Sequence, residues 1–198
     1  MKVTDYSQIA DKYDKNMYMR DLFLVEPNKQ YQKGSCDIEL NDTGVIQAEE
    51  LSNKVLKNKY KFSKIYSSPQ RRAVKTAEIL SKAANVEYIS IEGLQEINLG
   101  EWEGLSWAEV KEKYPIEYEE WYVNRRYAKH PKGKSYQDML QRVLTSIHKI
   151  VNENCDNAVI ITHSAVIMCI QCYLTNTPFD EMTKFKTNNT SITLMSKC

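Results

Sequence analysis

The stretch Ser67–Ala77 constrains the fold more than any other part of the chain, because a strand pattern ends in it and a helix pattern begins. Apolar residues at 62–66 favour a β-strand, and apolar residues three to four positions apart further on indicate an α-helix. Pro69 suits the first position of that helix, since its fixed φ angle already matches helical backbone. Unpaired N–H groups at a helix start, beside the guanidinium groups of Arg71 and Arg72, predict a local anion site. On its own, the stretch also fits a surface helix that merely begins with basic residues.

Strand-like and helix-like patterns alternate along the rest of the chain. Such alternation is typical of an α/β fold, here a three-layer sandwich with a largely parallel central sheet and helices on both faces. In sheets of this kind, chemistry gathers at the carboxyl ends of the strands. Two candidate elements follow strands in this way, the turn at 67–72 and His163. The expected strands span 17–25, 62–67, 86–91, 158–162 and 191–195, and the main expected helices span 42–55, 69–80, 136–151 and 164–174.

The length and charge of the chain restrict its partners. Its 198 residues suffice for a substantial core, so we expect a single domain over residues 1–198. Lys and Arg number 27 against 26 Asp and Glu, and a net charge of +1 provides no field to recruit nucleic acid or an anionic membrane. The longest apolar stretch, 158–170, is interrupted by polar residues, and the N-terminus lacks an apolar core of signal-peptide length. We therefore expect a cytoplasmic protein that binds neither nucleic acid nor a membrane.

The cysteines agree with a reducing compartment. There are five, an odd number, and their spacing shows no paired framework. Cys169 and Cys172 form a CxxC pair, but the pair lies in an apolar helical stretch without a second pair or nearby histidines. This context indicates core packing rather than a metal site.

Two segments lie outside the sandwich pattern. The first twenty or so residues resemble the opening of small-molecule methyltransferases, yet the six glycines of the chain contain no GxG pair for a cofactor. We interpret 1–16 as an N-terminal extension. Between about 105 and 135, aromatic residues such as Trp107 and Trp121 indicate one or two helices, which we expect to form a helical lid or side insertion.

Five ordered blocks together resemble the histidine phosphatase (phosphoglycerate mutase-like) superfamily over residues 28–196. Three of them are Ser67-Ser68-Pro69-x-x-Arg72-Ala73-x-x-Thr76-Ala77, Leu94-x-Glu96-x-x-x-Gly100-x-Trp102-x-Gly104 and Thr162-His163. The other two are Gly34-x-x-Asp37-x-x-Leu40-x-x-x-Gly44 and Gly133-x-Ser135-x-x-Asp138-x-x-x-Arg142-Val143. A set of five blocks in order is far more specific than any single block.

The resemblance implies a covalent phosphoryl-transfer mechanism. In that family, a histidine of an Arg-His-Gly motif at the end of the first strand becomes transiently phosphorylated, two arginines and a second histidine hold the phosphoryl oxygens, and an acid protonates the leaving oxygen. Fixed cations of this kind stabilise the charge of the transferring group. The resemblance implies no metal and no organic cofactor. Carried over to this chain, it makes Glu96 the general acid, His163 the second histidine, and Arg20, Arg72 and Asn28 the phosphate-binding residues.

The chain departs from the family where the nucleophile should stand. Counting back without a gap from Gly34 puts Asp21-Leu22-Phe23 in place of Arg-His-Gly, and a shift by one recovers Arg20 but places Asp21 at the histidine. The three histidines are His130, which we expect in a loop, His148, which we expect on the surface of a helix, and His163. None of them is a first-strand nucleophile. Where many members carry Gly-Glu-Ser, this chain has Gly133-Lys134-Ser135.

Three residues are conceivable substitutes for the missing histidine. Asp21 would form an acyl phosphate, but its carboxylate would occupy the place of the anion among the arginines. Cys36 follows the nucleophile position and has no evident base. His163 would have to act as nucleophile and as oxyanion ligand at once.

Three functional hypotheses follow. The first is a phosphomonoester hydrolase type of pocket with weak or lost activity, which takes a small phosphorylated metabolite or inorganic phosphate. The second is a non-catalytic binding or regulatory protein for a phosphorylated metabolite. The third is a remnant of a phosphatase whose first 25 residues were replaced by a rearrangement. The aromatic helices after residue 105 leave a homodimer possible.

Overall fold

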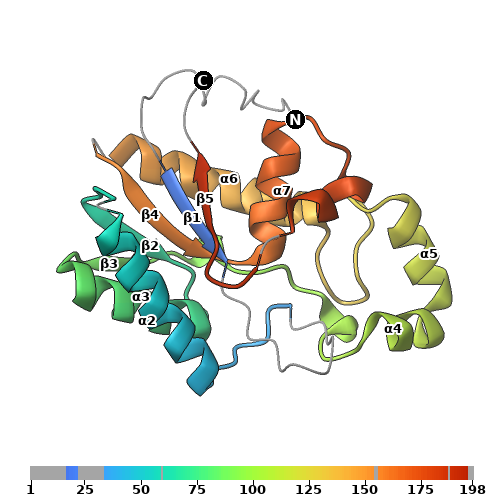
Figure 1. Cartoon of the computed structure of the whole chain (residues 1–198). Coiled ribbons are helices and arrows are strands. Elements are labelled where there is room, and N and C mark those ends of the chain that lie inside the picture. Colours follow the sequence, from blue (N-terminus) through green and yellow to red (C-terminus); the bar gives the residue numbers. More distant parts are fainter. Residues whose placement is uncertain (1–16, 22–33, 59, 154–155, 187, 196–198) are drawn as a thin grey trace.

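The computed structural model describes residues 17–21, 34–58, 60–153, 156–186 and 188–195, and they form an α/β sandwich around one sheet (Figure 1). The sheet has the strand order β3-β2-β4-β1-β5. Neighbouring strands are parallel except β5, which runs antiparallel to β1 at one edge. The expected largely parallel sheet is confirmed. The strands are β1 (Met17–Asp21), β2 (Lys64–Ser67), β3 (Tyr88–Ser90), β4 (Ala158–Thr162) and β5 (Ile192–Met195).

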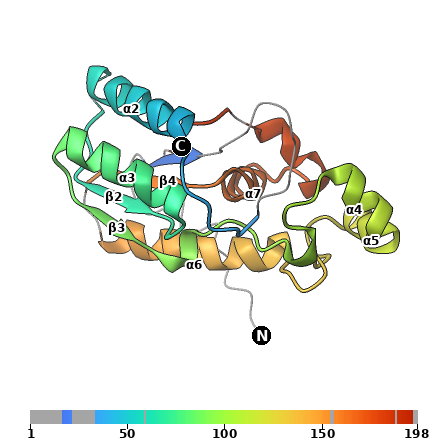
Figure 2. The ribbon, with the colours of Figure 1, turned by 90° about the horizontal axis from the view of Figure 1, so that it is seen from below.

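Helices cover both faces of the sheet, as the alternation of patterns predicts. Figure 2 shows α2 and α3 on one side of the strands and α6 on the other. The alternation along β4 explains these layers, because successive side chains of a strand point to opposite faces. Val159 and Ile161 pack with α2 and α3, whereas Ala158 and Ile160 pack with α6 and α7. These helices are α2 (Asp42–Lys57), α3 (Arg71–Ala84), α6 (Tyr136–Glu153) and α7 (Ser164–Leu174).

The start of α3 differs from the sequence-based expectation. The helix begins at Arg71, and Pro69 lies two residues before it rather than at its first position. Gln70 precedes the helix with extended backbone (φ −65°, ψ 134°). The N–H of Arg71 donates to Asp37 Oδ1 at 2.7 Å. One donor of the helix start is therefore satisfied by a carboxylate, so the anion site cannot rest on that N–H group.

The other boundaries agree with the patterns to within a few residues. β1 covers the first part of the expected strand at 17–25, and the remainder lies outside the described residues, as does the proposed extension at 1–16. β3 is shorter than the expected strand at 86–91. α2 begins where Asn41 Oδ1 accepts the N–H of Gly44 at 2.9 Å, a typical N-terminal cap.

The aromatic segment after residue 105 forms two short helices, α4 (Trp107–Lys113) and α5 (Pro115–Val123), which lie beside the sandwich rather than over the strands (Figure 1). A capping box between Ser106 and Glu109 begins α4. Pro115 is the first residue of α5, a position where the helix needs no backbone N–H donor. Among the described residues, no helix is both long and apolar enough to cross a membrane.

Candidate functional site

Two neighbouring strands end at the same edge of the sheet and bring the central residues of the site together. β2 ends at Ser67 and leads through Ser68 into α3, while β4 leads through His163 into α7. Ser67 lies opposite Ile161 in the parallel register, and the N–H of Ser68 donates to the carbonyl of Ile161 at 2.9 Å. As a result, His163 Nε2 and Ser68 Oγ lie 2.8 Å apart, although the residues are 95 positions apart in the chain.

Arg72 lies in the first turn of α3 and points into the protein, with 1% of its surface exposed. Its Nη1 donates to the carbonyl of Cys36 at 2.7 Å, and its Nη2 donates to the carbonyl of Gly34 at 3.2 Å. Two carbonyl contacts fix the plane of the guanidinium fork, which suits the recognition of an oxyanion. Arg71 differs, because it is exposed and pairs with Asp37 and Glu39 at the surface. Of the two arginines at this turn, Arg72 is the buried one.

Glu96 follows the short 3-10 turn Glu92–Leu94 and is buried, with 3% of its surface exposed. Its Oε1 accepts the N–H of Ile97 at 2.9 Å, and its Oε2 accepts the N–H of Ala165, in the first turn of α7, at 3.3 Å. Burial raises the pKa of the Glu96 carboxyl above its ordinary value, although these N–H groups and Arg72 act in the opposite direction. This is the direction that a general acid near neutral pH requires.

His163 is completely buried. Burial lowers the pKa of its imidazole well below the usual range, and the positive charges of Arg72 and Arg142 lower it further. When Ser68 Oγ donates to Nε2, the proton of the neutral ring lies on Nδ1. Within the part of the chain that the structure describes, Nδ1 has no hydrogen-bond partner. In this tautomer, the neutral imidazole presents a donor without an acceptor. When Ser68 Oγ instead donates to Gln70 Oε1, 3.5 Å away, the ring proton lies on Nε2 and Nδ1 is an acceptor.

Two further residues belong to this arrangement, and the sequence did not single them out. Gln70 Oε1 accepts the N–H of Glu96 at 2.8 Å, and Gln70 Nε2 is buried without a partner among the described residues. Arg142, from α6, donates from Nη2 to the carbonyls of Gln95 and Glu96 at 2.9 and 3.3 Å, and so holds the segment that carries the acid. Arg142 lay within a family-like block, which was the one signal that pointed to it.

The clamp, defined here as Ser68, Arg72, Glu96 and His163, thus combines a cation, an acid and a neutral donor at one edge of the sheet. The model of the "Histidine phosphatase superfamily (branch 1)" matches residues 25–196 of the chain. The chain belongs to this superfamily. The expected resemblance is confirmed, and the match includes all four clamp residues.

The names of similar proteins refer to different phosphorylated compounds. The chain is 29% identical over 181 residues to "Putative phosphoserine phosphatase 2" of Hydrogenobacter thermophilus, covering 88% of each protein. It is 31% identical over 161 residues to human 6-phosphofructo-2-kinase/fructose-2,6-bisphosphatase 3, covering 81% of this chain and 30% of that protein. The chain therefore spans about a third of that two-activity relative.

Solved structures of the superfamily share the fold. Bacillus stearothermophilus YhfR superposes with a TM-score of 0.79 at 25% identity, over 91% of this chain and 90% of that one. A mycobacterial glucosyl-3-phosphoglycerate phosphatase in complex with VO3 superposes with a TM-score of 0.77 at 22% identity, over 92% of each chain. The second likeness shows the fold alone.

The remaining predicted residues lie around β1. In this superfamily member, β1 is parallel to β4, and Asp21 lies opposite Thr162, the residue before His163. The backbone of Arg20 lies opposite Ile161, one residue earlier. The end of β1 is therefore beside the clamp, where the superfamily nucleophile is expected. Leu22 and Asn28 lie outside the described residues, so the predicted role of Asn28 stays a prediction.

The other two histidines and Cys36 are not suited to replace the nucleophile. His148 is exposed on α6 and contacts Asn152 Nδ2 at 2.8 Å, as expected for a surface residue. His130 lies in a loop but is buried among aromatic rings. Burial, followed by a hydrogen bond to Glu103, raises the pKa of the Cys36 thiol to about 11. A thiol with that pKa is not a thiolate nucleophile near neutral pH.

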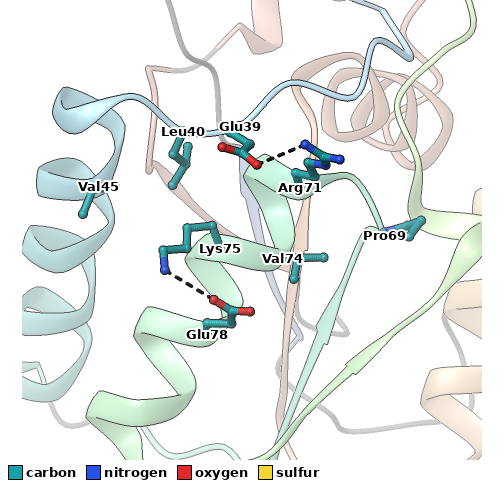
Figure 3. A pocket seen from close by; sticks show the side chains of 8 residues that line it. All are labelled: Glu39, Leu40, Val45, Pro69, Arg71, Val74, Lys75 and Glu78. Atoms are coloured by element: carbon teal, nitrogen blue, oxygen red, sulfur yellow. Dashed lines mark hydrogen bonds and ion pairs between the residues drawn. The ribbon is translucent and has the colours of Figure 1, made fainter.

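A cavity of about 440 Å³ lies on the outer side of α3, and none of the residues that line it belongs to the clamp (Figure 3). Four of its lining residues are apolar or proline, and the other four form the ion pairs Arg71 with Glu39 and Lys75 with Glu78. The paired charges give this cavity no preference for an anion. In the described part of the chain, no group of three or more His, Cys, Asp or Glu side chains is placed to hold a metal ion. The cavity is lined by Glu39, Leu40, Val45, Pro69, Arg71, Val74, Lys75 and Glu78.

Proposed function

We propose that the clamp binds the phosphoryl group of a small phosphorylated metabolite, or inorganic phosphate, and that the chain hydrolyses phosphomonoesters weakly or not at all. Arg72 supplies the fixed positive charge, His163 supplies a neutral donor, and Glu96 is placed to protonate a leaving oxygen. Each role follows the superfamily mechanism and the burial and contacts of these side chains.

One observation carries the proposal: two buried side-chain nitrogens near Arg72 have no hydrogen-bond partner among the described residues, and an anion would favour the His163 tautomer in which both are donors. They are His163 Nδ1 and Gln70 Nε2. The orientation of the Gln70 amide is set, because its oxygen must face the N–H of Glu96. Buried donors are nearly always paired, and each unpaired one costs about 1–3 kcal/mol. A phosphoryl group supplies several acceptor oxygens and a charge that Arg72 favours.

The weak activity follows from the residues at the end of β1. A covalent mechanism divides phosphoryl transfer into two easier steps, and it needs a nucleophile in line with the leaving oxygen. Two alignments with the family motif are possible at the nucleophile position. One places Leu22 and the other places Asp21 where the family has histidine. A carboxylate from Asp21 would compete with the phosphate for the cations. The clamp therefore retains the groups that bind and protonate while the group that attacks is absent.

A second candidate function uses the same site without turnover. A protein that holds a phosphorylated metabolite for regulation needs the cation and the donors but not the nucleophile. This candidate is favoured because positions 21 and 22 hold Asp and Leu instead of the nucleophilic histidine. The two functions differ only in phosphate release.

We extend the proposal to the rest of the chain as follows. The domain runs over the whole of 1–198 with 1–16 as an extension, and α4 and α5 act as a lid over the substrate or as a homodimer surface. The protein is cytoplasmic, requires no cofactor, and binds neither nucleic acid nor a membrane. The near-neutral net charge and the phosphatase relatives support this extension.

The test is a phosphate titration together with phosphate release from a panel of small phosphomonoesters. We expect the unmodified protein to bind phosphate with low turnover, and Leu22→His or Asp21→His to raise turnover by about tenfold or more. Arg72→Ala should weaken phosphate binding by about tenfold or more, whereas the exposed Arg71→Ala should change it less than about twofold. Absence of phosphate binding would refute the pocket. Efficient turnover that His163→Ala abolishes would refute the claim of impaired catalysis.

A further inference from the structure

Glu103, on the turn after Trp102, accepts four hydrogen bonds that converge from two segments. Ser35 donates to Oε1 from its N–H at 2.8 Å and from its hydroxyl at 2.6 Å. The thiol of Cys36 donates to Oε2 at 3.1 Å, and the N–H of Leu99 donates to Oε1 at 3.2 Å. A single carboxylate therefore ties the segment 34–36 to the segment 99–103, which lies 63 or more positions later in the chain.

The segment 34–36 lies close against the Glu103 carboxylate. Gly34 has a φ of +45°, a conformation that L side chains rarely adopt, and a Cβ added there would lie 2.6 Å from Glu103 Oε1. The backbone conformation favours glycine, and a side chain at this position would displace the carboxylate. The hydrogen bonds of Glu103 therefore depend on the close approach of this segment.

The opposite side of the same segment holds the cation of the clamp. The carbonyls of Gly34 and Cys36 accept hydrogen bonds from the guanidinium of Arg72. Glu103 contacts the N–H, hydroxyl and thiol groups of this segment, and Arg72 contacts its carbonyls. A displacement of the segment would therefore move these two carbonyls together.

We propose that Glu103 is a positioning residue for Arg72 and acts through the backbone of residues 34–36. The consequence for phosphate rests on the proposed function, whereas the effect on the Arg72 guanidinium does not. In Glu103→Gln, a neutral amide replaces the carboxylate, so the hydrogen bonds that a negative charge strengthens become weaker. The amide N–H₂ group then faces either the donor-only N–H groups of Ser35 and Leu99 or the thiol of Cys36, which is a weak acceptor. We expect the segment to shift and Arg72 to lose its fixed orientation. A misplacement of about 1 Å is enough to weaken a site of this kind markedly.

Glu101 provides a matched control two residues away. It lies on the same turn and has the same side chain, but it forms an ion pair with Lys132 instead of contacting residues 34–36. Glu101→Gln removes a negative charge at nearly the same place and leaves the contacts of Arg72 in place. Any general effect of charge or of the turn itself would appear in both variants.

The first experiment measures phosphate affinity by titration in the unmodified protein, Glu103→Gln, Glu101→Gln, Arg72→Ala and the double variant Glu103→Gln with Arg72→Ala. We expect Glu103→Gln to weaken phosphate binding about tenfold and Glu101→Gln less than about twofold. In the Arg72→Ala background, Glu103→Gln should have no further effect. An unchanged affinity in Glu103→Gln, or an equal loss with and without Arg72, would overturn the inference while leaving the proposed function intact.

The second experiment observes Arg72 directly by NMR of the arginine side-chain N–H groups, with the resonance assigned by its loss in Arg72→Lys. A buried guanidinium held by two carbonyls should show slowly exchanging N–H signals. These signals should persist in Glu101→Gln and disappear in Glu103→Gln, whether or not phosphate binds. Their persistence in Glu103→Gln would refute the positioning role. If the unmodified protein binds no phosphate, the proposed function fails, and this measurement still decides the inference.

Discussion

The described residues include two buried histidines, His163 and His130, whose neighbours differ in charge and in hydrogen bonding. His163 stands at a strand end beside a hydroxyl and two arginines. His130 stands in what we call the aromatic cluster, where its ring meets Trp102 edge to face at 4.9 Å and lies near Trp121 and Tyr136. The cluster consists of Trp102, Trp107, Tyr118, Trp121, His130 and Tyr136.

The comparison shows what an unpaired buried nitrogen can and cannot indicate. Both rings keep one nitrogen without a hydrogen-bond partner among the described residues, His163 at Nδ1 and His130 at Nε2. In His130, Nδ1 contacts the carbonyl of Lys134 at 2.6 Å and must donate, so the unpaired Nε2 is an acceptor. In His163, the unpaired nitrogen is a donor beside cations when Ser68 Oγ donates to Nε2. An anion site needs donors and positive charge together, and His130 itself offers an anion no unpaired donor.

The largest effect that separates the two regions is expected from Trp102, which is fully buried at the centre of the aromatic cluster. Trp102→Ala removes its contacts with Trp107, Trp121 and His130 and leaves a cavity. We expect a loss of about 3–5 kcal/mol in the free energy of unfolding, measured by denaturant titration. The partly buried Trp107→Ala should lose less. If the folded fraction of Trp102→Ala also lost phosphate affinity tenfold, the two regions would be coupled rather than separate.

A smaller effect is expected from exchanging the two histidines for alanine, one at a time. His163→Ala removes a donor that faces the proposed phosphate, and hydrogen bonds to charged groups contribute about 1.5–3 kcal/mol. Phosphate affinity should therefore fall about 10- to 100-fold. His130→Ala should leave affinity within about twofold, although it lowers stability, because its ring contacts the cluster and Lys134. Equal losses of affinity in the two variants would contradict the assignment of the anion site to the clamp.

Much of the fold followed from local patterns, because period-two and period-3.6 spacing report which faces of an element are buried. The start of α3 did not, since Gln70 adopts extended backbone there to place its side chain against Glu96. Arg72, Glu96 and His163 were found through motifs of the family. Glu103 was missed because its role depends on Ser35 and Cys36, 67 or more positions away, and no spacing along the chain records such a contact.

The burial of His130 also predicts a pH dependence of the free energy of unfolding. Burial lowers the pKa of His130 to about 4, against an ordinary value of 6.5. Between pH 6.5 and about pH 4, His130 is protonated in the unfolded chain but neutral in the folded chain. The free energy of unfolding therefore decreases as the pH is lowered through this range. Between pH 7.5 and pH 5 the contribution of His130 amounts to about 2 kcal/mol. His130→Phe should remove that part of the pH dependence in denaturant titrations at the two pH values, while the part due to His163 remains. An identical pH dependence in His130→Phe and in the unmodified protein would contradict this prediction, because His130 would then bind its proton equally well in the folded and unfolded states. The contrast between the two histidines would then rest on Arg72 and Arg142 alone.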